Sequence, residues 1–122
     1  MQKTDLNSQQ IQRLVSDVLR SESSAIEALA NNLPATCSQV VECLYRCDGR
    51  VIVTGMGKMS AIARKTAATL SSVGTPAVFL HPGEALHGDL GIVTSSDVML
   101  VLSNSGETNE ILELIPYLKR QH

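Results

Sequence analysis

The chain has 122 residues, of which 43% are hydrophobic, and a formal net charge of −2, which suits one domain with a modest core. The charge has the wrong sign for a nucleic-acid binder, and aromatic residues at 2% provide no stacking platform for bases. No apolar stretch reaches the roughly 18 residues of a membrane span, and the polar N-terminus does not resemble a secretory signal. With three cysteines outside any motif, these features predict a cytoplasmic protein with reduced thiols and no nucleic-acid or membrane partner.

Two helices are predicted before the first strand. Apolar residues at helical spacing indicate one long amphipathic helix over residues 8–31, and a shorter pattern at 40–45 indicates a second helix. We expect residues 1–48 to form a helical arm that either caps the domain or packs against another subunit. Cys43 and Cys47 lie four residues apart on the second helix, but two thiols alone make a poor zinc site.

From residue 49 onward, strands alternate with helices. The predicted strands are 51–57, 77–81 and 97–103, and the predicted helices are 60–72 and 107–121, with an irregular segment at 83–93. This alternation predicts an α/β fold, in which βαβ units build a parallel sheet that helices cover on both faces. Pro116 lies inside the last helix and should kink it or remove a hydrogen bond.

The loops after the three predicted strands are the candidate site. Ligands of such sheets bind outside the carboxyl ends of the strands. The segments that meet there are TGMGK at 54–58, HPGEALHGD at 81–89 and SNSGET at 103–108. Because three separate segments converge on one sheet edge, the sequence predicts a binding site at that edge.

The segment SNSGET precedes a helix, whose free N–H groups and dipole favour a bound anion such as phosphate. Gly106 allows a close approach of the backbone. Ordinary capping of the helix explains the same residue types, so the sequence leaves both interpretations open. The side chains that would donate to an anion are Ser103, Asn104, Ser105 and Thr108.

Four other residues at this edge have a structural and a chemical interpretation. Lys58 is either solvated or placed to meet a phosphate or a developing oxyanion. His81 and His87 are either loop residues or groups for proton transfer or metal binding. Glu110 is either a solvated helix acid or a base beside the anion.

The segments VIVTGMGK, ARKTAATLSSVGTPAVFLHPGEALHGDLGIV and LSNSGETNEI resemble the sugar isomerase (SIS) domain of the arabinose 5-phosphate isomerase family. The resemblance runs from about Gly49 to Leu118. It implies a flavodoxin-like, three-layer αβα domain at 49–122 that assembles as a homotetramer. It also implies interconversion of D-ribulose 5-phosphate and D-arabinose 5-phosphate through a cis-enediol(ate), without a required cofactor, for the synthesis of the sugar Kdo used in lipopolysaccharide or capsule.

The resemblance further implies roles for single residues. Lys58 and Glu110 match the catalytic positions, and His81 also matches a position that binds a divalent metal such as zinc. The substrate contacts that it implies are Gly74, Thr75, His81, His87, Ser103, Asn104, Ser105 and Thr108.

The sequence departs from the family pattern in two places. Met59, Ser60 and Ala61 stand where the family has Ser, Gly and His, although Ser60 returns a hydroxyl one position later. We also expect the later strands of the SIS domain, with a further catalytic glutamate and histidine, and the paired CBS modules of many members to be missing. The alternatives are therefore an active isomerase, a non-catalytic sugar-phosphate-binding module and an inactive isomerase fragment.

Overall fold

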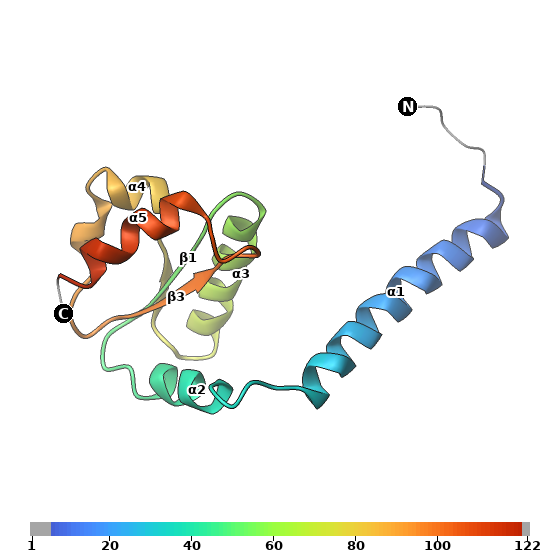
Figure 1. The fold of residues 1–122 in the computed structure, drawn as a ribbon, viewed down its shortest axis with the longest axis horizontal. Coiled ribbons are helices and arrows are strands. Elements are labelled where there is room, and N and C mark those ends of the chain that lie inside the picture. Colours follow the sequence, from blue (N-terminus) through green and yellow to red (C-terminus); the bar gives the residue numbers. More distant parts are fainter. Residues whose placement is uncertain (1–5, 121–122) are drawn as a thin grey trace. The chain divides into compact units, whose positions relative to one another are not determined.

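A computed structural model describes residues 6–120 of the chain, which divides into two compact units at residues 39 and 40 (Figure 1). The arm predicted for 1–48 and the domain predicted for 49–122 include residues 1–5 and 121–122, which lie outside the described residues. The boundary between the units comes earlier than the predicted one because Leu44 packs against the core of the second unit.

The first unit is dominated by the helix α1 (Ser8–Asn31), which has the predicted bounds. Its start is a capping box: the Asn7 side chain accepts from the Gln10 backbone N–H at 2.9 Å, and the Gln10 side chain accepts from the Asn7 backbone at 2.8 Å. None of its side chains is buried. No helix within residues 6–120 combines the length and the apolar character needed to cross a membrane.

The second unit is built on a parallel sheet, as predicted. The helix α2 (Cys37–Tyr45) leads into it, and its strands are β1 (Val51–Gly55), β2 (Ala77–Phe79) and β3 (Val98–Leu102). Their order is β2-β1-β3, and Val51 lies opposite both Ala77 and Val98. The central strand β1 is buried along its whole length.

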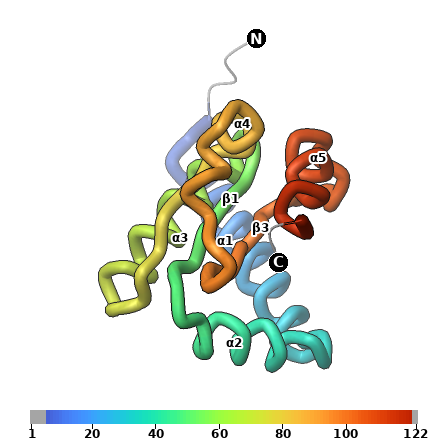
Figure 2. The backbone as a smooth tube through the Cα atoms, turned by 90° about the vertical axis from the view of Figure 1, so that its left-hand side faces the viewer, coloured from blue at the N-terminus to red at the C-terminus, as the bar shows by residue number. Residues whose placement is uncertain are grey.

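Helices cover both faces of this sheet, so the predicted three-layer α/β fold is confirmed (Figure 2). On one face, α3 (Lys58–Ser72) packs on Val51 and Val53; on the other, α5 (Asn109–Leu118) packs on Ile52. The segment predicted as irregular contains the helix α4 (Pro82–Leu86) and the 3-10 helix η1 (Asp89–Ile92), which join the Ile52 core.

Pro116 lies inside α5, which nevertheless continues to Leu118. Proline has no N–H, so the carbonyl of Leu112 loses its partner within the helix. Both residues are exposed, and water can therefore supply the missing hydrogen bond. The predicted loss of one hydrogen bond is accommodated at the surface.

An ion pair joins the amino ends of β1 and β3. The Asp97 side chain, 2% exposed, binds the Arg50 guanidinium at 3.0 Å and accepts from the backbone N–H groups of Arg50 and Thr94 at 2.7 and 2.9 Å. Burial acts to raise the pKa of Asp97, but the hydrogen bonds from Arg50 and Thr94 outweigh it and hold that pKa well below its usual value. A Cβ at Gly49 would lie 2.6 Å from this carboxylate, so only glycine fits there.

We expect Asp97→Asn to lower the free energy of unfolding at pH 7 by about 2 kcal/mol, because it removes the charge that Arg50 pairs with. Since the pKa of Asp97 is lowered in the folded state, its contribution is present above the ordinary carboxyl value of 3.8 and is lost as the pH falls below it. Urea unfolding at pH 7, 5 and 3 checks this. Asp48→Asn, an exposed acid, is the control; identical pH dependence in both variants and the parent would contradict the prediction.

Candidate functional site

The carboxyl ends of the three strands of the second unit lie on the same side of the sheet, because all three strands are parallel. We call this side the carboxyl edge of the sheet. Each strand is followed by a helix that starts at this edge: α3 begins at Lys58, and the N-cap residues of α4 and α5 are His81 and Thr108. The structure therefore brings together the three segments that the sequence singled out. Parallel α/β sheets bind their ligands at this kind of edge.

The turn after β1 contains two glycines, and each is required for a different reason. A Cβ at Gly55 would approach the carbonyl oxygens of Leu102 and Met59 to 3.0 Å, so close backbone packing excludes a larger residue. Gly57 has φ 58°, in the left-handed region that glycine tolerates. This turn starts α3 at Lys58, which is exposed at the sheet edge.

Ser60 has a role inside this turn. Its hydroxyl donates to the carbonyl of Gly57 at 2.7 Å. Ser60 stands one position after the serine of the family pattern. Its hydroxyl proton is used in the hydrogen bond that closes the first turn of α3. Only its lone pairs are left to interact with a ligand.

The loop after β3 is held by its own hydroxyl groups. Ser103 Oγ accepts from the Gly106 N–H at 3.0 Å and lies 3.0 Å from Thr108 Oγ1, and Ser105 Oγ accepts from the Glu107 N–H at 3.1 Å. Gly106 has φ 72°, which allows the tight turn. These hydrogen bonds and the turn at Gly106 therefore define the conformation of the loop.

The start of α5 lacks a side-chain cap. Thr108 is the N-cap residue, but its hydroxyl pairs with Ser103 and makes no capping bond. The Ile111 N–H donates to the Thr108 carbonyl at 3.0 Å, but within residues 6–120 the N–H groups of Asn109 and Glu110 have no partner. This favours the anion-site interpretation over ordinary capping. Glu110 lies in this first turn and is partly buried, and Asn104 is exposed in the loop.

His81 is positioned by backbone bonds and by an aromatic neighbour. The buried Thr54 hydroxyl donates to the Leu80 carbonyl at 2.6 Å, and His81 Nδ1 accepts from the Gly83 N–H at 3.2 Å. A neutral imidazole that accepts at Nδ1 has its proton on Nε2. His81 is thus arranged as a hydrogen-bond donor through Nε2.

This arrangement does not fit the metal role predicted for His81. A metal-bound imidazole needs a lone pair toward the metal and usually donates through its other nitrogen, whereas Nδ1 of His81 accepts. Residues 6–120 also contain no group of three His, Cys, Asp or Glu side chains able to hold an ion. Zinc at His81 stays a prediction without support from the described side chains.

His87 is the C-cap residue of the five-residue helix α4, which starts at this edge, and it is exposed. The structure does not bring two other predicted residues to this edge. Gly74 and Thr75 connect the end of α3 to the start of β2, so they lie at the opposite edge of the sheet. Because α3 runs between the two edges, these residues are about 20 Å from Lys58 in the same chain.

Sequence reasoning missed two residues beside His81. The ring of Phe79 lies edge-on to His81 with centroids 6.3 Å apart, and the Arg64 guanidinium lies 4.1 Å from the Phe79 centroid. The contact of Phe79 with His81 could have been predicted from the sequence, because residues two apart in a strand lie on the same face of the sheet. Arg64 had no such signal, since its contact depends on how α3 packs on β2.

The chain is 53% identical over 104 residues to the arabinose 5-phosphate isomerase KdsD of Yersinia pestis, and the match covers 85% of this chain and 32% of that protein. The chain therefore spans about a third of the length of this curated relative.

Two solved structures are also similar to this one. One is an Escherichia coli CFT073 protein in complex with arabinose 5-phosphate, with a TM-score of 0.89 and 40% identity, covering 95% of this chain and 62% of that one. The other is a Listeria monocytogenes protein described as a putative sugar-phosphate isomerase, with a TM-score of 0.89 and 30% identity, covering 96% and 62%.

The family model for the SIS domain matches residues 44–122, which include all three strands, the loops that follow them and well over half of the chain. The protein belongs to the SIS domain family.

Proposed function

We propose that the chain carries the phosphate-binding and proton-transfer residues of an isomerase that interconverts D-ribulose 5-phosphate and D-arabinose 5-phosphate. The observation that carries this proposal is the start of α5. Its N–H groups have no side-chain cap and directly follow the hydroxyl-rich loop 103–108, at the same edge of the sheet as Lys58. The name of the Yersinia relative and the sugar-phosphate complex of the Escherichia coli protein support the substrate class. The product would supply Kdo synthesis for lipopolysaccharide or capsule.

In the proposed reaction, the loop 103–108 and the first turn of α5 hold the phosphate group. The Glu110 carboxylate takes the proton from the hydroxyl-bearing carbon beside the carbonyl and returns it to the former carbonyl carbon. The proton of that hydroxyl group moves to the former carbonyl oxygen, so aldose and ketose interconvert through a cis-enediol(ate). The electron pair moves within the sugar, and the reaction needs no external oxidant or organic cofactor.

Two further residues complete the proposed chemistry. The Lys58 ammonium stabilises the negative charge that develops on the sugar oxygen. His81, which keeps its proton on Nε2 while Nδ1 accepts from Gly83, donates to a sugar hydroxyl or to the ring oxygen during ring opening. His87 is exposed and would contact a hydroxyl group of the sugar, whereas Asn104 belongs to the loop that holds the phosphate.

The position of Gly74 and Thr75 supports self-association. If these residues contact the substrate, a second copy has to supply them, because in one chain they lie at the edge opposite Lys58. We propose that the protein acts as a homotetramer in the cytoplasm, with sites completed by neighbouring copies.

A non-catalytic sugar-phosphate-binding module is the second candidate. The residues Met59, Ser60 and Ala61 favour it, because Ser60 uses its hydroxyl proton on Gly57 and no imidazole follows Lys58 within the first turn of α3. This candidate predicts binding of phosphosugar without turnover.

Phosphate binding is tested with Ser103→Ala. We expect this variant to bind inorganic phosphate about tenfold more weakly, because Ser103 both accepts from Gly106 and holds the Thr108 hydroxyl. Titration followed by backbone amide NMR shifts of residues 103–110 measures the affinity. Ser95→Ala, at an exposed serine, is the matched control. Equal affinity in both variants, or shifts elsewhere only, would count against the loop.

Catalysis is tested with Glu110→Gln in the 122-residue chain, with D-ribulose 5-phosphate as substrate and D-arabinose 5-phosphate as the measured product. We expect turnover to fall by about 10²–10⁴-fold, as for loss of a general base, with phosphate affinity retained. Glu113→Gln, an exposed acid one turn away on α5, should leave turnover unchanged. Unchanged turnover in Glu110→Gln removes Glu110 from the chemistry, and a parent chain that binds without turnover favours the binding module.

A further inference from the structure

The imidazole of His81 makes only one hydrogen bond within residues 6–120. Its Nδ1 accepts from the Gly83 N–H at 3.2 Å, at the long end of the usual range. A Cβ at Gly83 would lie 3.3 Å from this nitrogen, so glycine lets the ring lie against the backbone. Because the side-chain torsion that turns a histidine ring is broad, one bond does not fix the direction of Nε2. A second contact is needed to orient the ring.

Phe79 provides this second contact. The backbone stays extended at His81, with φ −74° and ψ 130°, so the two side chains lie on the same face of the sheet. Their ring centroids are 6.3 Å apart and their planes are inclined by 67°, which is the edge-to-face geometry that aromatic rings favour. The Gly83 N–H and the Phe79 ring together therefore determine the orientation of the imidazole.

Phe79 is held in turn by Arg64. The strand β2 is at the edge of the described sheet, so no further strand of residues 6–120 packs beside Phe79. The central carbon of the Arg64 guanidinium lies 4.1 Å from the centroid of the Phe79 ring, within the range of a cation–π interaction. Among the same residues, no carboxylate lies within 4.0 Å of Arg64. No ion pair in this part of the chain therefore competes with the ring for the charge of Arg64.

We propose that Phe79 and Arg64 are positioning residues for His81. The Arg64 guanidinium holds the Phe79 ring, and this ring holds the imidazole so that Nε2 donates to the sugar phosphate. The inference rests on the proposed function for the identity of the acceptor, a sugar hydroxyl or the ring oxygen. Neither positioning residue has to touch the substrate. If Arg64 only covered apolar surface with its methylene groups, a neutral side chain of similar length would serve equally well.

The Gly83 amide reports on the imidazole directly, because His81 Nδ1 is its only partner within the described residues. Hydrogen exchange of this amide, followed by NMR in the whole chain, is the first measurement. We expect Phe79→Leu to accelerate it by about two- to tenfold, since the edge-to-face contact is lost. Arg64→Met should accelerate it by about two- to fivefold. Phe79→Tyr, which keeps the ring, and Arg64→Lys, which keeps the charge, should stay closer to the parent.

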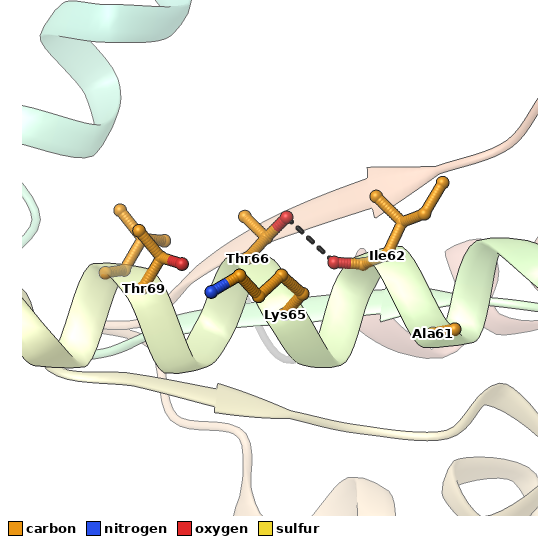
Figure 3. Close-up of a pocket in the computed structure, with 6 residues that line it drawn as sticks. Ala61, Ile62, Lys65, Thr66 and Thr69 are labelled. Atoms are coloured by element: carbon orange, nitrogen blue, oxygen red, sulfur yellow. Dashed lines mark hydrogen bonds between the residues drawn. The ribbon is translucent and has the colours of Figure 1, made fainter. Parts of the chain in front are cut away.

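Lys65 offers the matched control for Arg64. It is the next residue of α3 and is also exposed, but Figure 3 shows its side chain lying along the helix in the direction of Thr69. Lys65→Met therefore removes a cation from the same turn without uncovering Phe79, and Gly83 should exchange as in the parent. Unchanged exchange in both Phe79→Leu and Arg64→Met, or equal acceleration in Arg64→Met and Lys65→Met, overturns the proposal. Circular dichroism checks that each variant is folded, and the exposed Arg64 keeps the test valid if Phe79→Leu is not.

Turnover of D-ribulose 5-phosphate is the second measurement. Phe79→Leu and Arg64→Met should lower kcat by about two- to tenfold and leave KM near the parent value, because the loop 103–108 still holds the phosphate. Unchanged kcat together with faster Gly83 exchange would show that the orientation of His81 is not used, and would overturn the proposal. A parent chain without turnover would contradict the proposed isomerase instead, and the Gly83 exchange rates would then decide by themselves whether Phe79 and Arg64 position His81.

Discussion

The parallel pairing of β1 with both neighbours is the constraint on which the rest of the second unit depends. All five residues of β1 are buried, and its alternating side chains supply both cores: Ile52 toward α4 and α5, and Val51 and Val53 toward α3. A buried strand must satisfy its backbone groups through its neighbours. Because both neighbours run parallel to it, three chain segments far apart in the sequence must end at the same edge, and the candidate site follows from this.

The two edges of the sheet use polar groups for different purposes. At the amino edge, the buried Asp97 carboxylate accepts hydrogen bonds from the guanidinium and the backbone N–H of Arg50. Its charge is therefore paired, and the pair joins β1 to β3. At the carboxyl edge, hydroxyl groups such as Ser103 bind their own loop, and the α5 N–H groups have no side-chain cap. Charge at one edge stabilises the fold, while donors at the other remain for a ligand. A phosphosugar needs the second kind of edge.

Much of this could be predicted from local pattern. The helix at 8–31 and the alternation of strands and helices were visible as periodicity, which depends only on neighbouring residues. The segment at 83–93 was less clear, because α4 and η1 are too short to show a period and are held by the core through Leu90 and Val93. The site was predictable as a set of residues at one edge. The hydrogen bonds of Thr108 and His81 were not, because each depends on the distance to one particular atom in the folded loop.

The sequence by itself determined the class of fold, the edge of the sheet that carries the candidate site and the family resemblance, because periodicity, glycine turns and motifs are properties of short segments. Only the tertiary structure decided which groups remain free at that edge. It showed that Thr108 pairs with Ser103 instead of capping α5, that Ser60 binds Gly57, and that Gly74 lies at the opposite edge. The physical reason is that a hydroxyl or an amide can satisfy several partners equally well, and the packing of the strands and helices determines which one comes within reach.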